Sequence, residues 1–164
     1  MHPFDEIKSD GLLGMTAWAR NLAGALFACG ALGAMPARAL EYRAVGDAAA
    51  ILYDAPSSRA NKVYVVNRGY PLEVIVAVEG WVKVRDANGS LTWIESKQLS
   101  DKRNVMIRVP VAQVRQKPDD SSPVAFQAQQ NLLLELVDVS GGWLQVRHRD
   151  GGTGYVKAQQ VWGA

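Results

Sequence analysis

The chain has 164 residues and a formal net charge of +2, from 18 basic and 16 acidic side chains. Basic and acidic residues are interspersed, so the chain lacks the clustered basic face with which proteins bind nucleic acid. Its single cysteine, Cys29, excludes an intrachain disulfide, and its two histidines leave few candidates for nucleophilic or metal chemistry.

The first part of the chain has the features of a secretory signal peptide. An uncharged apolar run from Asn21 to Met35 follows Arg20, and Ala37-Arg38-Ala39 ends it with a small-x-small pattern. We therefore expect residues 1–39 to be a signal peptide that is cleaved after Ala39. The expected location of the exported protein is the periplasm.

Other interpretations of this segment are open. Acidic residues precede the apolar run, which is unusual in a signal peptide, and a start at Met15 removes them. An uncleaved inner-membrane anchor over residues 21–39 is a second interpretation, although an apolar run of about 15 residues is shorter than the roughly 20 that span a bilayer. Cys29 weakly resembles a lipoprotein acylation site, but the apolar run continues past it.

From residue 40 onward the chain repeats itself. A shift of 62 residues aligns its two halves without a gap and brings Gly80-Trp81 onto Gly142-Trp143. Two matched tryptophans in a gapless alignment indicate two copies of one module. We place copy one at residues 45–100 and copy two at residues 105–163.

Each copy has the pattern of short β-strands. In copy one, residues 72–78 and 81–85 alternate with a two-residue period, and Asp86-Ala87-Asn88-Gly89 predicts a hairpin loop between the second of these strands and residues 91–94. The alternation places the following side chains on inward faces: Leu72, Val74, Val76, Val78, Val82 and Val84, with Leu144 and Val146 in copy two. Short strands within about 60 residues predict a small all-β barrel.

These motifs resemble the bacterial SH3-like (SH3b) domain family. Copy two carries three of its motifs: Val114-Arg115-Gln116-Lys117-Pro118, Gly142-Trp143-Leu144-Gln145-Val146 and Gly154-Tyr155-Val156. Copy one keeps Gly80-Trp81-Val82-Lys83-Val84 but has Tyr53 in place of the arginine and Thr92 in place of the glycine. The resemblance implies an all-β fold of two tandem, small, five-stranded, partly open barrels. It also implies peptidoglycan binding, enzyme targeting or protein contacts.

The candidate ligand-binding residues lie on the outward faces of the strands. A tryptophan that shares its face with charged residues is not an obvious core residue, and Tyr53 resembles a groove tyrosine of the eukaryotic relatives. The candidates are Tyr53, Trp81, Lys83, Arg85, Trp143 and Arg147. Alternatively, Trp81 and Trp143 pack one copy against the other or cap the barrels, and we expect Trp93 and Tyr155 to pack and Trp162 to hold the last strand in place.

We expect no enzyme, because the chain after residue 40 has one histidine, His148, which is predicted to be exposed in a hairpin, and no cysteine. We also expect no cofactor and no metal. The predicted function is a non-catalytic periplasmic or cell-envelope binding module that recognises peptidoglycan stem peptides or an extended segment of a protein partner. The alternative is a structural scaffold of an envelope complex, formed through barrel edges or inter-barrel contacts. A membrane contact is expected only through the N-terminal segment, if that segment is not cleaved.

Overall fold

The structure, a computed structural model, describes residues 40–164, which belong to one compact unit. The expected signal peptide at residues 1–39, the alternative start Met15 and the alternative anchor at 21–39 lie outside the described residues. The described part consists of β-strands with two short 3-10 helices, η1 (Ser96–Gln98) and η2 (Ala158–Gln160). None of its helices is long and apolar enough to cross a membrane.

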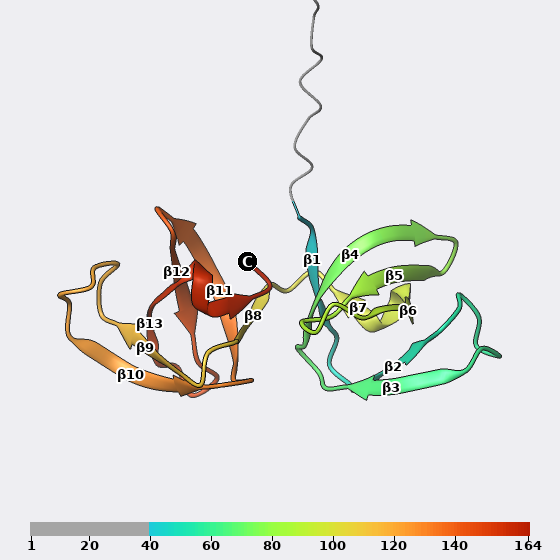
Figure 1. Cartoon of the computed structure of the whole chain (residues 1–164), viewed down its shortest axis with the longest axis horizontal. Helices are drawn as coiled ribbons and strands as arrows, with labels where there is room; N and C mark the ends of the chain where they lie inside the picture. Colours follow the sequence, from blue (N-terminus) through green and yellow to red (C-terminus); the bar gives the residue numbers. More distant parts are fainter. Residues whose placement is uncertain (1–39) are drawn as a thin grey trace, which may run out of the picture. The chain divides into compact units, whose positions relative to one another are not determined.

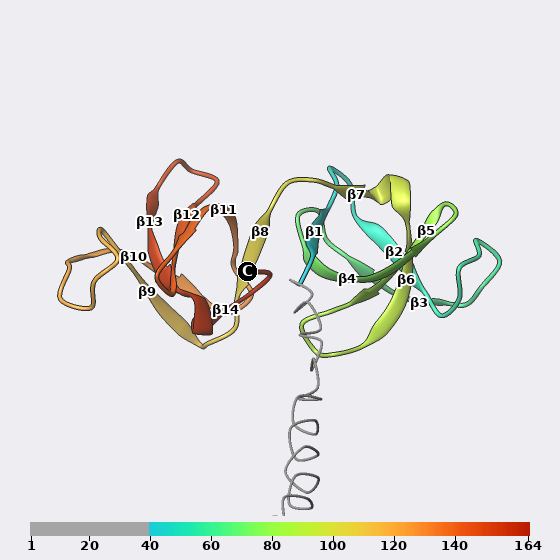
Figure 2. The same cartoon turned by 90° about the horizontal axis from the view of Figure 1, so that it is seen from above.

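Each copy forms one seven-stranded antiparallel sheet that curls on itself (Figures 1 and 2). Barrel one contains β1 (Tyr42–Val45), β2 (Ala50–Tyr53), β3 (Lys62–Val66), β4 (Pro71–Val78), β5 (Trp81–Arg85), β6 (Leu91–Glu95) and β7 (Leu99–Ser100), in the order β3-β2-β6-β5-β4-β1-β7. Barrel two contains β8 (Asn104–Ile107), β9 (Val111–Arg115), β10 (Val124–Gln129), β11 (Leu133–Ser140), β12 (Trp143–Arg147), β13 (Thr153–Lys157) and β14 (Val161–Trp162), in the equivalent order.

The expected all-β fold of two tandem, partly open barrels is confirmed. Each sheet has seven short strands, whereas the resemblance implied five, because residues on either side of the central strands also pair. In barrel one, β1 pairs with both β4 and β7. The sheet ends at β3 and β7, which do not pair with each other, so one edge strand of the barrel is β3.

Each barrel encloses its own apolar core. The core of barrel one contains Val45, Ala50, Leu52, Val66, Leu72, Val82, Val84, Ile94 and Leu99. The core of barrel two contains Val105, Ile107, Ala112, Val114, Ala128, Leu134, Leu144, Val146, Val156 and Val161. The inward orientation predicted from strand alternation is confirmed for Val82, Val84, Leu144 and Val146, which are at most 3% exposed. All these residues lie between positions 45 and 161, so the chain from Leu40 onward contains both cores in full.

The alternation expected along β4 is wrong beyond Val74. The register with β5 shifts between Val74 and Val76, so that Val74 pairs with the inward-facing Val84 but Val76 pairs with the outward-facing Lys83. Val76 and Val78 are each 44% exposed. One extra residue in a strand moves every later side chain to the opposite face. Barrel two has the same shift at the equivalent place.

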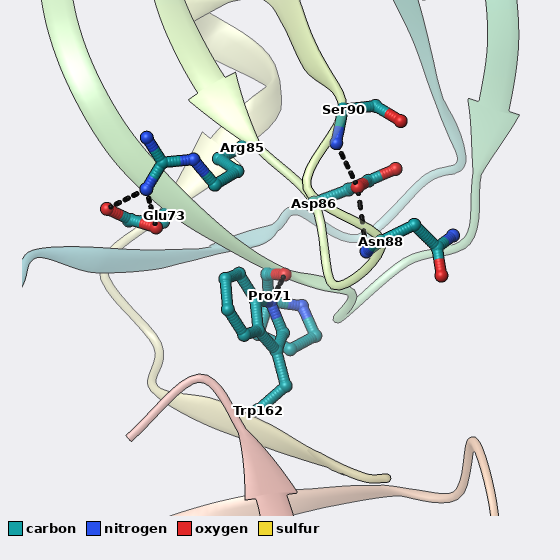
Figure 3. A network of polar contacts seen from close by, with 7 residues as sticks. All are labelled: Pro71, Glu73, Arg85, Asp86, Asn88, Ser90 and Trp162. Atoms are coloured by element: carbon teal, nitrogen blue, oxygen red, sulfur yellow. Dashed lines mark hydrogen bonds and ion pairs between the residues drawn. The ribbon is translucent and has the colours of Figure 1, made fainter.

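The predicted hairpin loop after β5 is confirmed, and a buried carboxylate organises it (Figure 3). Asp86 is 3% exposed, and its Oδ1 accepts hydrogen bonds from the backbone N–H groups of Asn88 and Ser90, both at 2.9 Å. Its Oδ2 accepts a hydrogen bond of 2.5 Å from the hydroxyl of Tyr64 on β3. Gly89 has a φ of 88°, a conformation that a residue with a Cβ rarely adopts.

The two barrels contact each other through the last strand of barrel two. Trp162 lies in β14, which pairs with β8, and its Nε1–H also donates a hydrogen bond of 3.1 Å to the carbonyl of Pro71 in barrel one (Figure 3). Its ring meets Tyr42 edge-on, with centroids 5.2 Å apart and planes at 86°. Asn104 Nδ2 donates a second hydrogen bond across this contact, 2.8 Å long, to the carbonyl of Gly69. Trp162 therefore pairs within the last strand of barrel two and also connects this strand to barrel one.

Candidate functional site

Three aromatic side chains gather on the outer side of barrel one. Tyr53 on β2 and Trp81 on β5 meet edge to face, with ring centroids 5.3 Å apart and planes at 90°. Trp93 lies on β6, the strand between them, where it pairs with both Tyr53 and Lys83. We call the surface formed by Tyr53, Trp81 and Trp93 the aromatic face.

The aromatic face is only partly open to solvent. Trp81 and Trp93 are half-buried, while Tyr53 is 7% exposed and therefore supports Trp81 more than it offers surface of its own. Strand parity explains the arrangement, because Trp81 and Lys83 alternate with the inward-facing Val82. The structure therefore brings together Tyr53 and Trp81, two of the candidates named from the sequence.

Charged side chains border the aromatic face. Lys83 places its Nζ 5.8 Å from the centroid of the Trp93 ring, a distance typical of a cation–π contact. Glu95 lies opposite Trp81 in the β5–β6 pairing and forms an ion pair of 2.5 Å with Lys97. The Glu95 carboxylate raises the pKa of the exposed Lys97. Lys83 is thus the cation of this border that does not have a neighbouring carboxylate at ion-pair distance among residues 40–164.

Barrel two does not reproduce the aromatic pair. The position of Tyr53 is taken by Arg115, whose Nη1 donates a hydrogen bond of 2.6 Å to the carbonyl of Ser122 in the adjacent loop. Arg115 Nη2 donates another, 2.9 Å long, to Gln113. This arginine is therefore held by its own barrel.

Trp143 is half-buried, like Trp81, but its neighbours are ionic. The Nζ of Lys157 lies 5.5 Å from the Trp143 ring centroid and 2.6 Å from a carboxylate oxygen of Asp120. Lys157 is the repeat equivalent of Glu95 in barrel one, so the charge beside the tryptophan that both barrels share is reversed between them. Neither Trp81 nor Trp143 makes the aromatic contact between barrels, since that contact is made by Trp162.

Arg85 and Arg147, also candidates for ligand binding, both face a glutamate within their own barrel. Arg85 Nη1 donates hydrogen bonds of 2.9 and 3.0 Å to the two carboxylate oxygens of Glu73 (Figure 3). The Glu73 side chain is 7% exposed and the Arg85 side chain 40%. In barrel two, Arg147 lies 3.5 Å from Glu135, and both side chains are about half exposed. The first pair is a structural bond, and the second is a loose surface contact.

His148 is less exposed than its hairpin position predicts, with 23% of its side chain accessible. Its Nδ1 lies 2.8 Å from Asp150 Oδ1, and its ring lies 6.2 Å from that of Phe126. Hydrogen bonds from the Gly152 N–H and from His148 lower the pKa of Asp150. Within the described residues, no group of three or more His, Cys, Asp and Glu side chains is placed to hold a metal ion.

Two members of this site are not among the candidates named from the sequence. The sequence predicts that Trp93 packs, whereas in the structure it pairs with Tyr53 and lies on the aromatic face. The sequence of copy one alone does not mark Glu95 as a binding residue. Only its alignment with Lys157 in copy two, which reverses the charge at this position, singles it out.

Comparison with known proteins places these observations in a family. The family model described as Bacterial SH3 domain matches the chain twice, over residues 46–101 and 108–163. No curated protein sequence matches the chain.

Three solved structures are similar to parts of the chain. They are NlpC2 from Trichomonas vaginalis (14% identity, 75% of this chain and 48% of that one, TM-score 0.35), NlpC1 from the same organism (14%, 77% and 47%, 0.36) and an NlpC/P60 family protein from Bacillus cereus (15%, 74% and 56%, 0.35). The chain spans about half the length of each.

Proposed function

The chain belongs to the bacterial SH3 domain family, and on this premise we propose that it is a non-catalytic binding module of the cell envelope. Its ligand in this proposal is an extended peptide, and specifically the stem peptide of peptidoglycan. The proposed location is the periplasm, consistent with the signal-like pattern at the start of the sequence.

The observation that carries the proposal is the aromatic face of barrel one. Trp81 and Trp93 are only half-buried, although burying them fully would stabilise the barrel. Tyr53 holds Trp81 edge-on and fixes the orientation of its ring. A rigid aromatic surface of this kind contributes large contact area at a small entropic cost, and such residues dominate binding energies at peptide interfaces.

The charge beside the aromatic face fits a ligand that carries carboxylates. Lys83 lies over Trp93 and has no carboxylate at ion-pair distance among the described residues. A peptide carboxylate that binds Lys83 lies next to the aromatic rings, so one ligand engages both features. Stem peptides of peptidoglycan are short, extended and rich in carboxylates, and so have this combination.

The two barrels are not equivalent in this proposal. The groove position of Tyr53 is occupied in barrel two by Arg115, which is bound to Ser122 and Gln113. Lys157, beside Trp143, is already paired with Asp120. We therefore assign ligand binding to Trp81, Trp93 and Lys83, with the buried Tyr53 supporting Trp81, and not to Trp143.

Co-sedimentation with insoluble peptidoglycan tests the proposal. The protein is residues 40–164, and the variants are Trp81→Ala and the matched control Trp143→Ala, each with a thermal melting curve to establish folding. We expect wild type and Trp143→Ala to sediment, and the affinity of folded Trp81→Ala to fall by about tenfold or more. The proposal is wrong if wild type stays in the supernatant, or if folded Trp81→Ala binds as well as wild type.

One observation favours a second candidate, a scaffold formed through a barrel edge. The edge strand β3 exposes Val63 and Val65, which are 48% and 63% accessible, where barrel two has Ala125 and Gln127. Exposed apolar edge strands pair readily with other chains. A wild-type protein that dimerises in light scattering while Val65→Lys stays monomeric supports the scaffold, and a monomeric wild type excludes this form of it.

A further inference from the structure

A cleft of about 620 Å³ lies where the two barrels meet. Barrel one contributes Asp47 and Arg68 to its walls, the segment between the barrels contributes Lys102, and barrel two contributes Arg147 and Arg149. Small-molecule sites have volumes of roughly 300 to 1,000 Å³. The cleft is therefore large enough for a ligand, and neither barrel forms it alone.

The contact between the barrels holds the walls of this cleft together. Gly69 and Asn104 line the cleft, and the hydrogen bond between them crosses from one barrel to the other. The contact is close at Gly163, where an added Cβ would lie 2.8 Å from the Cβ of Pro71 and 2.7 Å from the carbonyl of Asn104. The walls are thus positioned by specific packing and not by the linker alone.

The lining carries more positive than negative charge. Four cationic side chains line it, against two carboxylates. Asp47 lies 3.9 Å from Lys102, and Glu135 lies 3.5 Å from Arg147, so each carboxylate is next to one cation. An excess of two positive charges therefore remains in the lining.

Arg68 and Arg149 carry the two positive charges of the lining that have no carboxylate beside them. Arg68 comes from the loop between β3 and β4, and Arg149 from the hairpin between β12 and β13, so they approach the cleft from different barrels. Within residues 40–164, no carboxylate lies within 4.0 Å of either guanidinium. Both side chains are exposed and can turn toward a ligand.

We propose that this cleft is a second binding site, for a ligand that carries two neighbouring oxyanion groups such as phosphates or carboxylates. A guanidinium offers paired N–H donors that match the two oxygens of such a group. Because the two guanidiniums come from different barrels, they match a ligand with two anionic groups better than a ligand with a single one. The lining contains no Phe, Tyr or Trp, and its one aromatic ring, that of His148, lies beside Phe126, so recognition depends mainly on charge.

This site is separate from the proposed peptide site. None of Tyr53, Trp81 and Trp93 lines the cleft, and the proposed anion site does not depend on peptidoglycan binding. Because its cations are exposed, salt screens them, and each contributes only modestly to affinity. Removing both free arginines is expected to weaken binding by about tenfold.

Titration of ¹⁵N-labelled residues 40–164 with sodium pyrophosphate, and separately with tricarballylate, tests the site. We expect saturable shifts of amide signals near Arg68, Lys102 and Arg149 that weaken as sodium chloride is added. Saturation by either probe supports the site, and the tighter probe identifies the oxyanion as phosphate or carboxylate. Absence of saturable shifts at these positions with both probes overturns the proposal.

Charge-matched variants separate a site from general attraction. Arg68→Gln with Arg149→Gln should weaken the tighter probe by about tenfold, whereas Arg59→Gln with Lys117→Gln, which removes the same charge from exposed loops outside the cleft, should change affinity by less than about twofold. Equal losses in the two double variants contradict the proposal. Trp81→Ala should bind the probe normally, so failure of the peptide site and failure of this site are distinguishable.

Discussion

Replacing Trp162 by alanine tests whether the two barrels behave as one unit. The indole N–H donates to the carbonyl of Pro71, and its ring meets Tyr42 edge-on at 5.2 Å. The guanidinium of Arg108 lies 5.9 Å from the same ring. The substitution removes all three contacts but leaves both apolar cores intact, since Trp162 belongs to neither.

The expected loss in the free energy of unfolding can be estimated from these contacts. A hydrogen bond contributes about 1 kcal/mol net and an edge-to-face aromatic pair about another 1 kcal/mol. Loss of the half-buried ring surface adds roughly 1 kcal/mol. We therefore expect Trp162→Ala to lower the free energy of unfolding by about 3 kcal/mol. Trp162→Phe keeps a ring against Tyr42 but not the donor, and should cost about 1 to 2 kcal/mol.

Urea unfolding of residues 40–164, followed by tryptophan fluorescence and by amide exchange in each barrel, measures the effect. We expect a single transition in wild type and two separate transitions in Trp162→Ala, because the barrels lose their strongest mutual contact. Unchanged midpoint and cooperativity in Trp162→Ala would refute the reasoning. Such a result means that the barrels do not stabilise each other.

Three further predictions concern single barrels. Arg85→Ala should lower the free energy of unfolding by about 2 kcal/mol in urea, because it leaves Glu73 buried without a partner, whereas the exposed equivalent Arg147→Ala should cost less than about 1 kcal/mol. Burial and the hydrogen bond to Asp86 raise the pKa of Tyr64 to about 12. Its contribution to stability is therefore complete below pH 10 and is lost as pH rises toward 12, so wild type should lose stability more steeply than Tyr64→Phe in alkaline melting curves. Gly154→Ala should lower the melting temperature through a cost of about 1–3 kcal/mol, because its Cβ would lie 2.6 Å from a buried valine and 2.8 Å from a backbone carbonyl; an unchanged melting temperature contradicts that packing.

The fold follows from the sequence to the extent that its signals are local. Turn residues, the two-residue period of β5 and the repeat together predict tandem barrels with Val84 and Val146 inside, as found. The shift in β4 could not be predicted, because residues 72–78 are mostly apolar on both faces and nothing marks the extra residue. The contact between Trp162 and Pro71 could not be predicted from the sequence either, since it joins positions 91 residues apart.

For the candidate site, too, local patterns could be predicted from the sequence and contacts between distant residues could not. Parity places Trp81 on the outward side of β5, and Tyr53, which resembles a groove tyrosine of the eukaryotic relatives, meets it edge to face. The partners of Arg85 and Arg115 depend on which side chains from neighbouring strands and loops reach them, and only the structure supplies that. The repeat is informative here, because it shows that equivalent positions in the two barrels have different chemistry.

The central claim, that the aromatic face of barrel one binds peptide, is tested most directly by the indole N–H signals of residues 40–164. We would titrate ¹⁵N-labelled protein with soluble stem-peptide fragments of peptidoglycan and follow its four tryptophans. The account predicts saturable shifts of the Trp81 and Trp93 signals, with little change at Trp143 and none at Trp162, whose N–H is bound to Pro71. Shifts centred on Trp143, or no saturable shift at Trp81, would contradict it.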